Sequence, residues 1–338
     1  MQREITAAQT LLDEKGELIQ PGYARKMLFE YNREQINAGL FSLKEWDFYQ
    51  VISGDYVLQL TIGHVSYVAS FSAMLFNIRT GEKKSFTRMK PLPMRGIDMP
   101  RNPEKPNVLE AEGKDYKMRF ETRSSERLLF MQAEDKKLGK IDIDLVLNND
   151  TDNEKLVIAT PFFKKNQFYL NYKESYYGIS GHVKFGDMHM QPGTEDTALL
   201  DWGRGVWPFK HEWFWGIGAG FVNGGRFGFN IGWGFGDLQY ATENMFFWNG
   251  KAHKLDVLIV ERDKQDYMKP WHFIDNDGLF DFTMTPIYDR FTENNMIVIN
   301  THCHQIFGSY SGTAVLPDGE IIEVENMTAF CEHAENRW

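Results

Sequence analysis

The residues best suited to do chemistry lie in and just after one stretch, residues 201–237, that is very rich in tryptophan, phenylalanine and glycine. Three of them can exchange protons: Asp201, His211 and Glu243. A carboxylic acid kept neutral by apolar walls can donate a proton to an alkene or to a leaving oxygen, and tryptophan faces stabilise the cation that develops. The sequence therefore predicts Glu243 or Asp201 as an acid and His211 as a base or relay.

Arg204 favours Glu243 over Asp201 as the acid, because a nearby guanidinium stabilises the ionised form of a carboxyl group. An ion pair between Asp201 and Arg204 that fixes a turn explains these two residues equally well. A buried histidine whose hydrogen bonds are satisfied is the corresponding structural explanation for His211. The polar and aromatic side chains predicted to bind the ligand are Arg204, Trp207, Trp213, Trp215, Asn230, Trp233 and Asn244.

Packing accounts for much of the aromatic and glycine content of the stretch. If Asn223 and Gly224 form a two-residue hairpin loop, each bulky residue lies opposite a glycine, as Trp215 lies opposite Gly232. If Gly225 also belongs to the loop, the register slips by one residue and the bulky side chains share one face. We favour the two-residue loop, which leaves the embedded polar residues as the better evidence for a site.

Composition and charge indicate a globular protein of one large domain or two smaller ones. The chain has 338 residues, of which 42% are hydrophobic and 25% are charged. A formal net charge of −10 disfavours nucleic acid and anionic membrane surfaces as partners. No apolar run resembles a signal peptide or a membrane span, so we expect a soluble, cytoplasmic protein. Cys303 and Cys331 are expected to be free thiols, and the oligomeric state stays open.

Short apolar runs with a period of two dominate the chain, and Asn-Gly or Asp-Gly turn signals separate several of them. We count roughly fourteen to eighteen candidate strands, which suit two eight-stranded units or a large sandwich. One helix is expected, near residues 22–37. The proline-rich segment 90–106 must be irregular, and serves either as a lid or as a long connection.

Metal and cofactor sites find little support. His302 and His304 share one face of a predicted strand, a spacing that could give two imidazole ligands, with Cys303 pointing away. No third ligand is evident nearby in sequence, so two histidines at a barrel rim are the favoured interpretation and no metal is predicted. The glycine-rich residues 232–237 lack the following helix that a nucleotide loop uses, and we expect no cofactor.

Several motifs together resemble one bacterial family, domain-of-unknown-function family 2804. They include DWGRGVWP, ATENM, HQIFGSYSG and the terminal ENRW, and the match spans nearly the whole chain. More remotely, the chain is similar to lipocalin-like double-barrel proteins such as hydroxyneurosporene synthase and tocopherol cyclase. The resemblance implies an all-β fold with few helices, in which two lipocalin-like (calycin-type) antiparallel β-barrels follow in tandem, residues 1–190 and 191–338, with the aromatic site in the second. It carries no catalytic residue across.

We therefore expect a small, hydrophobic, isoprenoid- or lipid-like ligand in an aromatic-lined cavity, with hydratase- or cyclase-like acid–base chemistry as one option. A non-catalytic ligand carrier and a carbohydrate-binding or carbohydrate-processing protein are the alternatives. A mostly apolar pocket with one isolated carboxyl group would favour proton chemistry, whereas several paired polar groups would favour binding or sugar processing. A structural protein would have barrels filled by side chains and no cavity.

Overall fold

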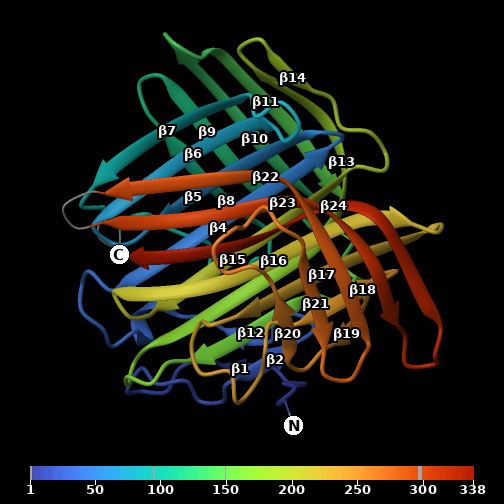
Figure 1. Cartoon of the computed structure of the whole chain (residues 1–338). Helices are drawn as coiled ribbons and strands as arrows, with labels where there is room; N and C mark the ends of the chain where they lie inside the picture. The colour runs from blue at the N-terminus through green and yellow to red at the C-terminus, as the bar shows by residue number, and fades with distance from the viewer. Residues whose placement is uncertain (1, 94–95, 149, 296–298) are drawn as a thin grey trace.

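The computed structural model describes residues 2–93, 96–148, 150–295 and 299–338, and within these ranges nearly all regular structure is β-strand (Figure 1). One short 3-10 turn, η1 (Arg33–Gln35), is the single helical element among the described residues. Long apolar helices of the kind that cross a membrane are absent from those ranges. A parallel pair formed by β1 (Gln9–Thr10) and β3 (Phe29–Glu30) stands apart from the two large sheets.

The first large sheet follows the order β7-β6-β5-β4-β15-β13-β11-β10-β9-β8; β12 and β14 also pair with β13, and β2 pairs with β12. Its strands are β2 (Gly22–Ala24), β4 (Leu43–Ser53), β5 (Tyr56–His64), β6 (Val68–Asn77), β7 (Lys83–Pro91), β8 (Asn107–Glu112), β9 (Tyr116–Thr122), β10 (Glu126–Asp135), β11 (Gly139–Asn148), β12 (Leu156–Pro161), β13 (Phe168–Phe185), β14 (Met188–Met190) and β15 (Thr197–Val206).

The second large sheet follows the order β19-β18-β17-β16-β24-β23-β22-β21-β20, with antiparallel pairing throughout. Its strands are β16 (Lys210–Val222), β17 (Gly225–Trp233), β18 (Met245–Trp248), β19 (Lys251–Lys254), β20 (Leu258–Glu261), β21 (Trp271–Asp275), β22 (Phe280–Asn295), β23 (Asn300–Val315) and β24 (Ile321–Arg337).

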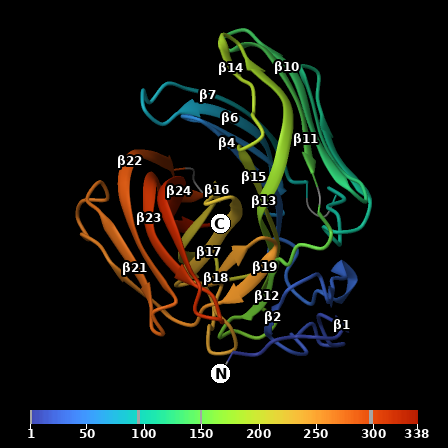
Figure 2. The ribbon, with the colours of Figure 1, turned by 90° about the vertical axis from the view of Figure 1, so that its right-hand side faces the viewer.

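Each large sheet curls into a half-barrel around its own apolar core, and the two half-barrels lie against each other (Figure 2). Leu145 and Tyr172 belong to the first core, and Phe229 and Phe282 belong to the second. A third cluster, with Val57, Phe76, Leu199, Trp215, Ile217, Phe307 and Phe330, packs one sheet on the other. The predicted all-β fold with two lipocalin-like barrels in tandem is confirmed.

The pleat of the central strands decides which side chains can reach the space between the sheets. On β15, Leu200, Trp202 and Arg204 point into the first half-barrel, whereas Asp201 and Gly203 point toward the second sheet. The chain leaves the first sheet only after Val206, where β15 ends, and enters the second at Lys210. The division of the chain into two domains, residues 1–190 and 191–338, stays a prediction.

The hairpin between β16 and β17 has the two-residue loop that we favoured. Val222 pairs with Gly225, so Asn223 and Gly224 form the loop, with φ of 50° and 79°. Positive φ at both positions is the geometry of a type I′ turn, which matches the strand twist. Trp215 pairs with Gly232, as the two-residue loop requires.

The helix expected near residues 22–37 is wrong. The segment holds β2, β3 and η1, joined by extended chain. Its buried side chains Met27, Phe29, Tyr31 and Arg33 recur every second residue, which is the period of extended backbone and not of a helix.

The proline-rich segment 90–106 is irregular after β7 ends at Pro91, as expected, and its described part has buried and exposed residues along its length. Met99 is fully buried there. Three buried arginines donate to its carbonyls: Arg33 to Ile97 at 2.7 Å, Arg204 to Pro100 at 2.9 Å and Arg127 to Pro103 at 2.6 Å. These three arginines anchor the described part of the segment to the first half-barrel.

Close packing of the hairpin against β24 predicts that an added methyl group at Gly218 is destabilising. A Cβ there would lie 2.4 Å from the Ala329 Cβ and 2.9 Å from a Phe229 ring carbon. We expect Gly218→Ala to lower the free energy of unfolding by about 1–3 kcal/mol in urea titrations. Gly39→Ala is the control, because its nearest neighbour, the Ser42 hydroxyl oxygen, is 3.4 Å away. Equal stability of the two variants would contradict this packing.

Candidate functional site

A cavity of about 330 Å³ lies between the two half-barrels. Ligand pockets in proteins span roughly 300–1,000 Å³, so the space suits a small molecule. Its walls come from β4, β5, β6, β13 and β15 of the first sheet and from β16, β17, β22, β23 and β24 of the second, together with connecting residues. Half of the lining residues are aromatic or aliphatic: Trp46, Phe48, Val65, Val68, Tyr169, Trp213, Phe214, Trp215, Trp233, Phe235, Leu238 and Trp338.

Two rows of cross-strand neighbours, one on each sheet, carry most of the polar side chains of the cavity. The first row runs across β5, β4, β15 and β13 as Thr61, Phe48, Asp201 and Lys173. The second row runs across β22, β23, β24, β16 and β17 as Arg290, Gln305, Glu332, Trp215 and Gly232. Within each row, neighbouring residues are roughly 5 Å apart. The two rows face each other across a slot, since Lys173 of the first row contacts the ring of Trp215 in the second.

Lys173 is the cation at one end of this slot, and its side chain is 3% exposed. Its Nζ lies 3.3 Å from Asp201 Oδ1 and 3.9 Å from Glu243 Oε2. The same ammonium lies 3.8 Å from the centre of the Trp215 ring, a cation–π contact. A buried ammonium without partners would cost several kcal/mol. Lys173 therefore joins an acid of the first sheet to an acid and a tryptophan of the second.

Asp201 is the fixed acceptor of the group. Asn171 Nδ2 donates to its Oδ1 at 2.6 Å, and Trp46 Nε1 donates to its Oδ2 at 3.2 Å. With Lys173, three donors surround this carboxyl group, which is the arrangement that stabilises a buried carboxylate.

Glu243 occupies the space that Gly232 leaves free: a Cβ on that glycine would lie 3.1 Å from Glu243 Oε2. Burial raises the pKa of Glu243, and the Asp201 charge raises it further, while Lys173 acts in the opposite direction. Glu243 is therefore the carboxyl group of this end whose surroundings favour its protonated form.

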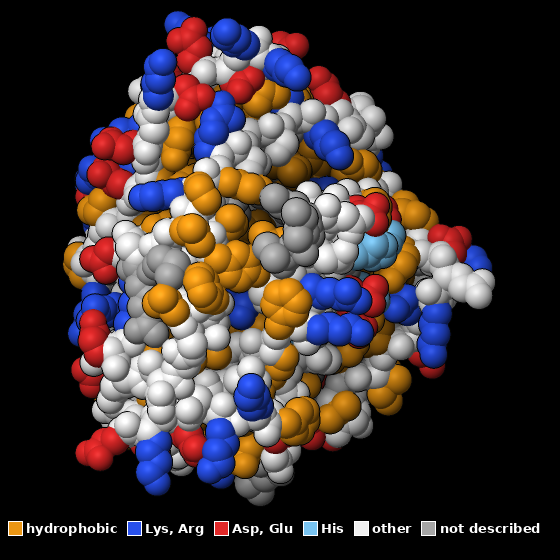
Figure 3. Space-filling view, turned by 90° about the vertical axis from the view of Figure 1, so that its left-hand side faces the viewer, with side chains coloured by type: hydrophobic (Ala, Val, Ile, Leu, Met, Phe, Trp, Pro, Cys, Tyr) orange, Lys and Arg blue, Asp and Glu red, His pale blue; other side chains and the backbone are white. Residues whose placement is uncertain are grey.

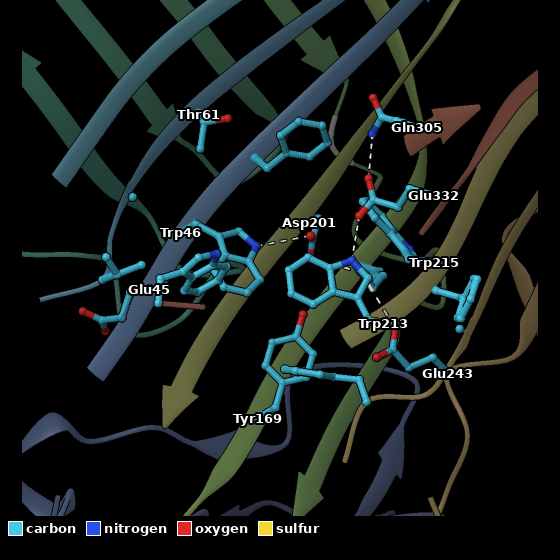
Figure 4. Close-up of a pocket in the computed structure, with 18 of the residues that line it drawn as sticks. Glu45, Trp46, Thr61, Tyr169, Asp201, Trp213, Trp215, Glu243, Gln305 and Glu332 are labelled. Carbon is cyan, nitrogen blue, oxygen red and sulfur yellow. Dashed lines mark hydrogen bonds and ion pairs between the residues drawn. The ribbon is translucent and has the colours of Figure 1, made fainter. Parts of the chain in front are cut away.

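Glu332 is a third buried acid at the cavity, and its two oxygens accept separate hydrogen bonds. Trp213 Nε1 donates to Oε1 at 2.7 Å, and Gln305 Nε2 donates to Oε2 at 2.9 Å. Burial raises the pKa of Glu332, and both hydrogen bonds oppose that shift. Figure 4 shows Asp201, Glu243 and Glu332 approaching the same space from different segments of the chain.

Five of the ten predicted site residues line the cavity: Asp201, Trp213, Trp215, Trp233 and Glu243. The other five, Arg204, Trp207, His211, Asn230 and Asn244, are buried outside its lining. Two of these five support the walls. Asn230 accepts from Trp215 Nε1 at 2.8 Å and donates to the Glu243 carbonyl at 2.7 Å, and Asn244 Oδ1 accepts from the Gly232 amide at 2.9 Å.

The ion pair expected between Asp201 and Arg204 is wrong, because the two residues lie three apart in a strand and therefore face opposite sides of the sheet. Arg204 Nη2 lies 2.7 Å from Asp47 Oδ1 inside the first half-barrel, and its Nε lies 3.6 Å from Glu45 Oε1. The partner of Asp201 is Lys173 instead.

His211 and Trp207 belong to an aromatic cluster behind the cavity wall. The His211 ring stacks on Trp213 with centroids 5.4 Å apart, and its Nδ1 lies 2.9 Å from the Pro208 carbonyl oxygen. Trp207 packs edge-on against His211, and the Trp338 ring packs against both. Burial lowers the pKa of His211 to about 4. This neutral imidazole thus supports a tryptophan of the wall.

Sequence reasoning missed several polar residues of the site, above all Lys173, Glu332, Gln305 and Arg290. Lys173 interrupts the apolar strand FYLNYKES, and Glu332 interrupts AFCEHA. A charged residue in an otherwise apolar strand was the feature that could have indicated these site residues. Their partners depend on which strands become neighbours, which the sequence does not show.

The two rim histidines have acidic partners of their own. His304 Nδ1 lies 2.7 Å from Asp289 Oδ2, and His302 Nδ1 lies 3.7 Å from Glu335 Oε2. Within the described ranges, no group of three or more His, Cys, Asp or Glu side chains is arranged to hold a metal ion.

The low pKa of His211 predicts a pH-dependent contribution to stability. The unfolded chain binds a proton near the ordinary value of 6.5, whereas the folded protein binds it only near 4. Stability is therefore full above pH 6.5 and is lost as the pH falls toward 4, by about 2 kcal/mol between about pH 7.5 and about pH 5. We expect His211→Gln to remove that share of the pH dependence in urea titrations. An unchanged slope in the variant would contradict a neutral His211.

Comparisons with known proteins agree with this architecture. Kievitone hydratase from Nectria haematococca superposes with a TM-score of 0.55 at 10% identity, over 98% of each chain. A protein assigned as an AttH from Nitrosomonas europaea has a TM-score of 0.47 at 11% identity, over 90% of this chain and 95% of that one. A search of curated protein sequences found no match. The family described as "Domain of unknown function (DUF2804)" matches residues 2–338, and the chain belongs to that family.

Proposed function

We propose that the cavity binds a small, mainly hydrophobic molecule and that Glu243 transfers a proton to it. Several paired polar groups line the cavity, among them Asp201 with Lys173 and Glu332 with Gln305, so the polarity criterion stated from the sequence favours binding or sugar processing. The observation that carries this proposal against that criterion is Glu243, a carboxyl group whose pKa is raised by burial, in a cavity of ligand size that tryptophans line.

Trp233 lines the cavity next to Gly232 and Glu243, and its aromatic ring suits a positive charge that develops on a substrate. The Trp215 ring already contacts the Lys173 ammonium. The fold shared with kievitone hydratase is compatible with this reaction class, and the argument rests on the residues of the cavity.

Four acids line the cavity, and Glu45 is held by Arg33 and His64. The other three differ in how many hydrogen bonds their carboxyl oxygens already accept. Asp201 and Glu332 each accept two hydrogen bonds from neighbouring side chains at 3.2 Å or less. The contact of Glu243 with Lys173 is longer, at 3.9 Å. Glu243 also has a side-chain hydrogen bond with Asn230, so it has one such partner where Asp201 and Glu332 each have two, and its neutral form can donate to a ligand.

In the proposed reaction the Glu243 proton forms a new C–H bond with an alkene carbon of the substrate, using the π electron pair. The neighbouring carbon becomes cationic and is attacked by the oxygen of a water molecule or of a hydroxyl group on the substrate itself. That oxygen loses a proton, and the Glu243 carboxylate accepts it. The acid is thus restored, and the net result is addition of O–H across the double bond.

One face of the molecule near the C-terminus is apolar at its centre. Trp338 lines the cavity and lies at the C-terminus, on the left-hand side in Figure 1. The space-filling view of that side shows hydrophobic side chains gathered around its centre, with lysine and arginine beside them (Figure 3).

The proposal is tested with protein purified from its own host and examined by native mass spectrometry for a bound molecule. Incubated with that molecule in heavy water, wild-type protein should place one deuterium on a carbon of the product at each turnover. Glu243→Gln cannot donate this proton, and we expect its turnover to fall by about 10²–10⁴-fold while ligand binding persists.

Glu174→Gln is the matched control, since Glu174 is also a buried acid whose pKa is raised, but it belongs to the opposite face of β13 and does not line the cavity. Its turnover should stay near that of the wild type. A ligand that is bound and released unchanged would identify a carrier, and equal loss of turnover in both variants would contradict the role of Glu243.

A further inference from the structure

Arg290 is a cavity residue that the proposed proton transfer does not use. It lies on β22 at the end of the second row, far from Glu243. Its Nε donates to Gln305 Oε1 at 2.7 Å, and its Nη1 donates to Thr292 Oγ1 at 3.2 Å. Both partners are neutral. For Nη2, the described residues provide no hydrogen-bond partner.

Arg290 is partly exposed, and within the described part of the chain no carboxylate oxygen lies within 4.0 Å of its guanidinium. Its charge acts on Glu332, whose pKa it lowers, without a direct ion pair. Asp289 contacts His304 instead, and Glu332 is held by Trp213 and Gln305. Lys173, the other cation of the cavity, has carboxylate partners. A guanidinium that borders an apolar cavity without a counter-ion is a place for an anionic oxygen.

The chain of contacts behind Arg290 fixes its orientation. Gln305 Oε1 accepts from Arg290 and, at 2.8 Å, from Gln59 Nε2 of the first sheet, while the amide of Gln305 donates to Glu332. Figure 4 shows Gln305 and Glu332 side by side at one end of the cavity and Glu243 at the other. Arg290 is thus held at the end opposite the proposed proton donor.

We infer that the ligand of this cavity is an elongated apolar molecule with a carboxylate at one end, and that Arg290 binds this carboxylate. The inference rests on the proposed binding function and adds the chemical class of the ligand. Four strand spacings separate Arg290 from Gly232, beside Glu243, a span of at most roughly 19 Å across the curled sheet. The apolar part of the molecule would then lie along Trp213 and Trp215, with its reacting atoms near Glu243.

Two fluorescent probes with the same ring system separate charge recognition from cavity binding. N-phenyl-1-naphthylamine is neutral, whereas 8-anilinonaphthalene-1-sulfonate adds one anionic group. We expect wild-type protein to bind the sulfonate more tightly, and Arg290→Met to weaken sulfonate binding by about tenfold or more while the neutral probe is little affected. Dodecanoate should displace the neutral probe from wild-type protein better than dodecan-1-ol, and Arg290→Met should abolish that preference.

Arg226→Met is the control, because Arg226 is an exposed arginine of β17 outside this cavity; it should behave as the wild type does. Arg290→Lys keeps the charge and should retain part of the preference, which also guards against a folding defect in the methionine variant. If the neutral probe binds but Arg290→Met leaves both preferences unchanged, the inference is wrong and the proposed function stands. If neither probe binds folded wild-type protein, both are wrong.

Discussion

The burial of the Lys173 ammonium between two curled sheets is the constraint on which the rest of the site depends. A charge with 3% of its side chain exposed needs partners, and they come from both half-barrels: Asp201 from one, Glu243 and Trp215 from the other. Removing one partner of such a pair costs about 3–5 kcal/mol, because the remaining charge stays buried. The contacts of Lys173 that hold the sheets together therefore also place two acids and a tryptophan beside one cavity. The same side chains stabilise the fold and form the candidate site.

The β-pleat divides the polar residues of the first sheet into two sets with different roles. Arg204 and Asp47 face the interior of the first half-barrel, where Arg204 also anchors the proline-rich connection. Asp201 and Lys173 face the second sheet. Residues close together in the sequence thus belong to different hydrogen-bond networks. Residues far apart in the sequence, such as Trp46 and Asp201, belong to the same network.

Local patterns predicted the all-β class, the family resemblance supplied the two tandem barrels, and five of the residues selected from the sequence line the candidate cavity. The Asn223-Gly224 turn and the alternation of glycine with bulky residues predict the register that puts Gly232 opposite Trp215. The helix expected near residues 22–37 failed because its buried side chains recur every second residue. Lys173, Glu332 and Arg290 could not be assigned, since their roles depend on the pairing of strands distant in sequence and on two sheets meeting, which no local pattern encodes. His211 was selected for its chemistry, and packing against Trp213 decided its place.

The central claim is that Glu243 is protonated in the folded protein at neutral pH, since a proton donor must hold its proton before the substrate arrives. Infrared difference spectroscopy of wild type and Glu243→Gln measures this directly through the carbonyl stretch of a protonated carboxylic acid. We expect such a band in wild-type protein at neutral pH. The part of the band that Glu243 contributes should disappear in Glu243→Gln and should persist in Glu174→Gln, which removes only the contribution of Glu174. A spectrum of Glu243→Gln that lacks only carboxylate bands would show that Glu243 is ionised, and would contradict the claim.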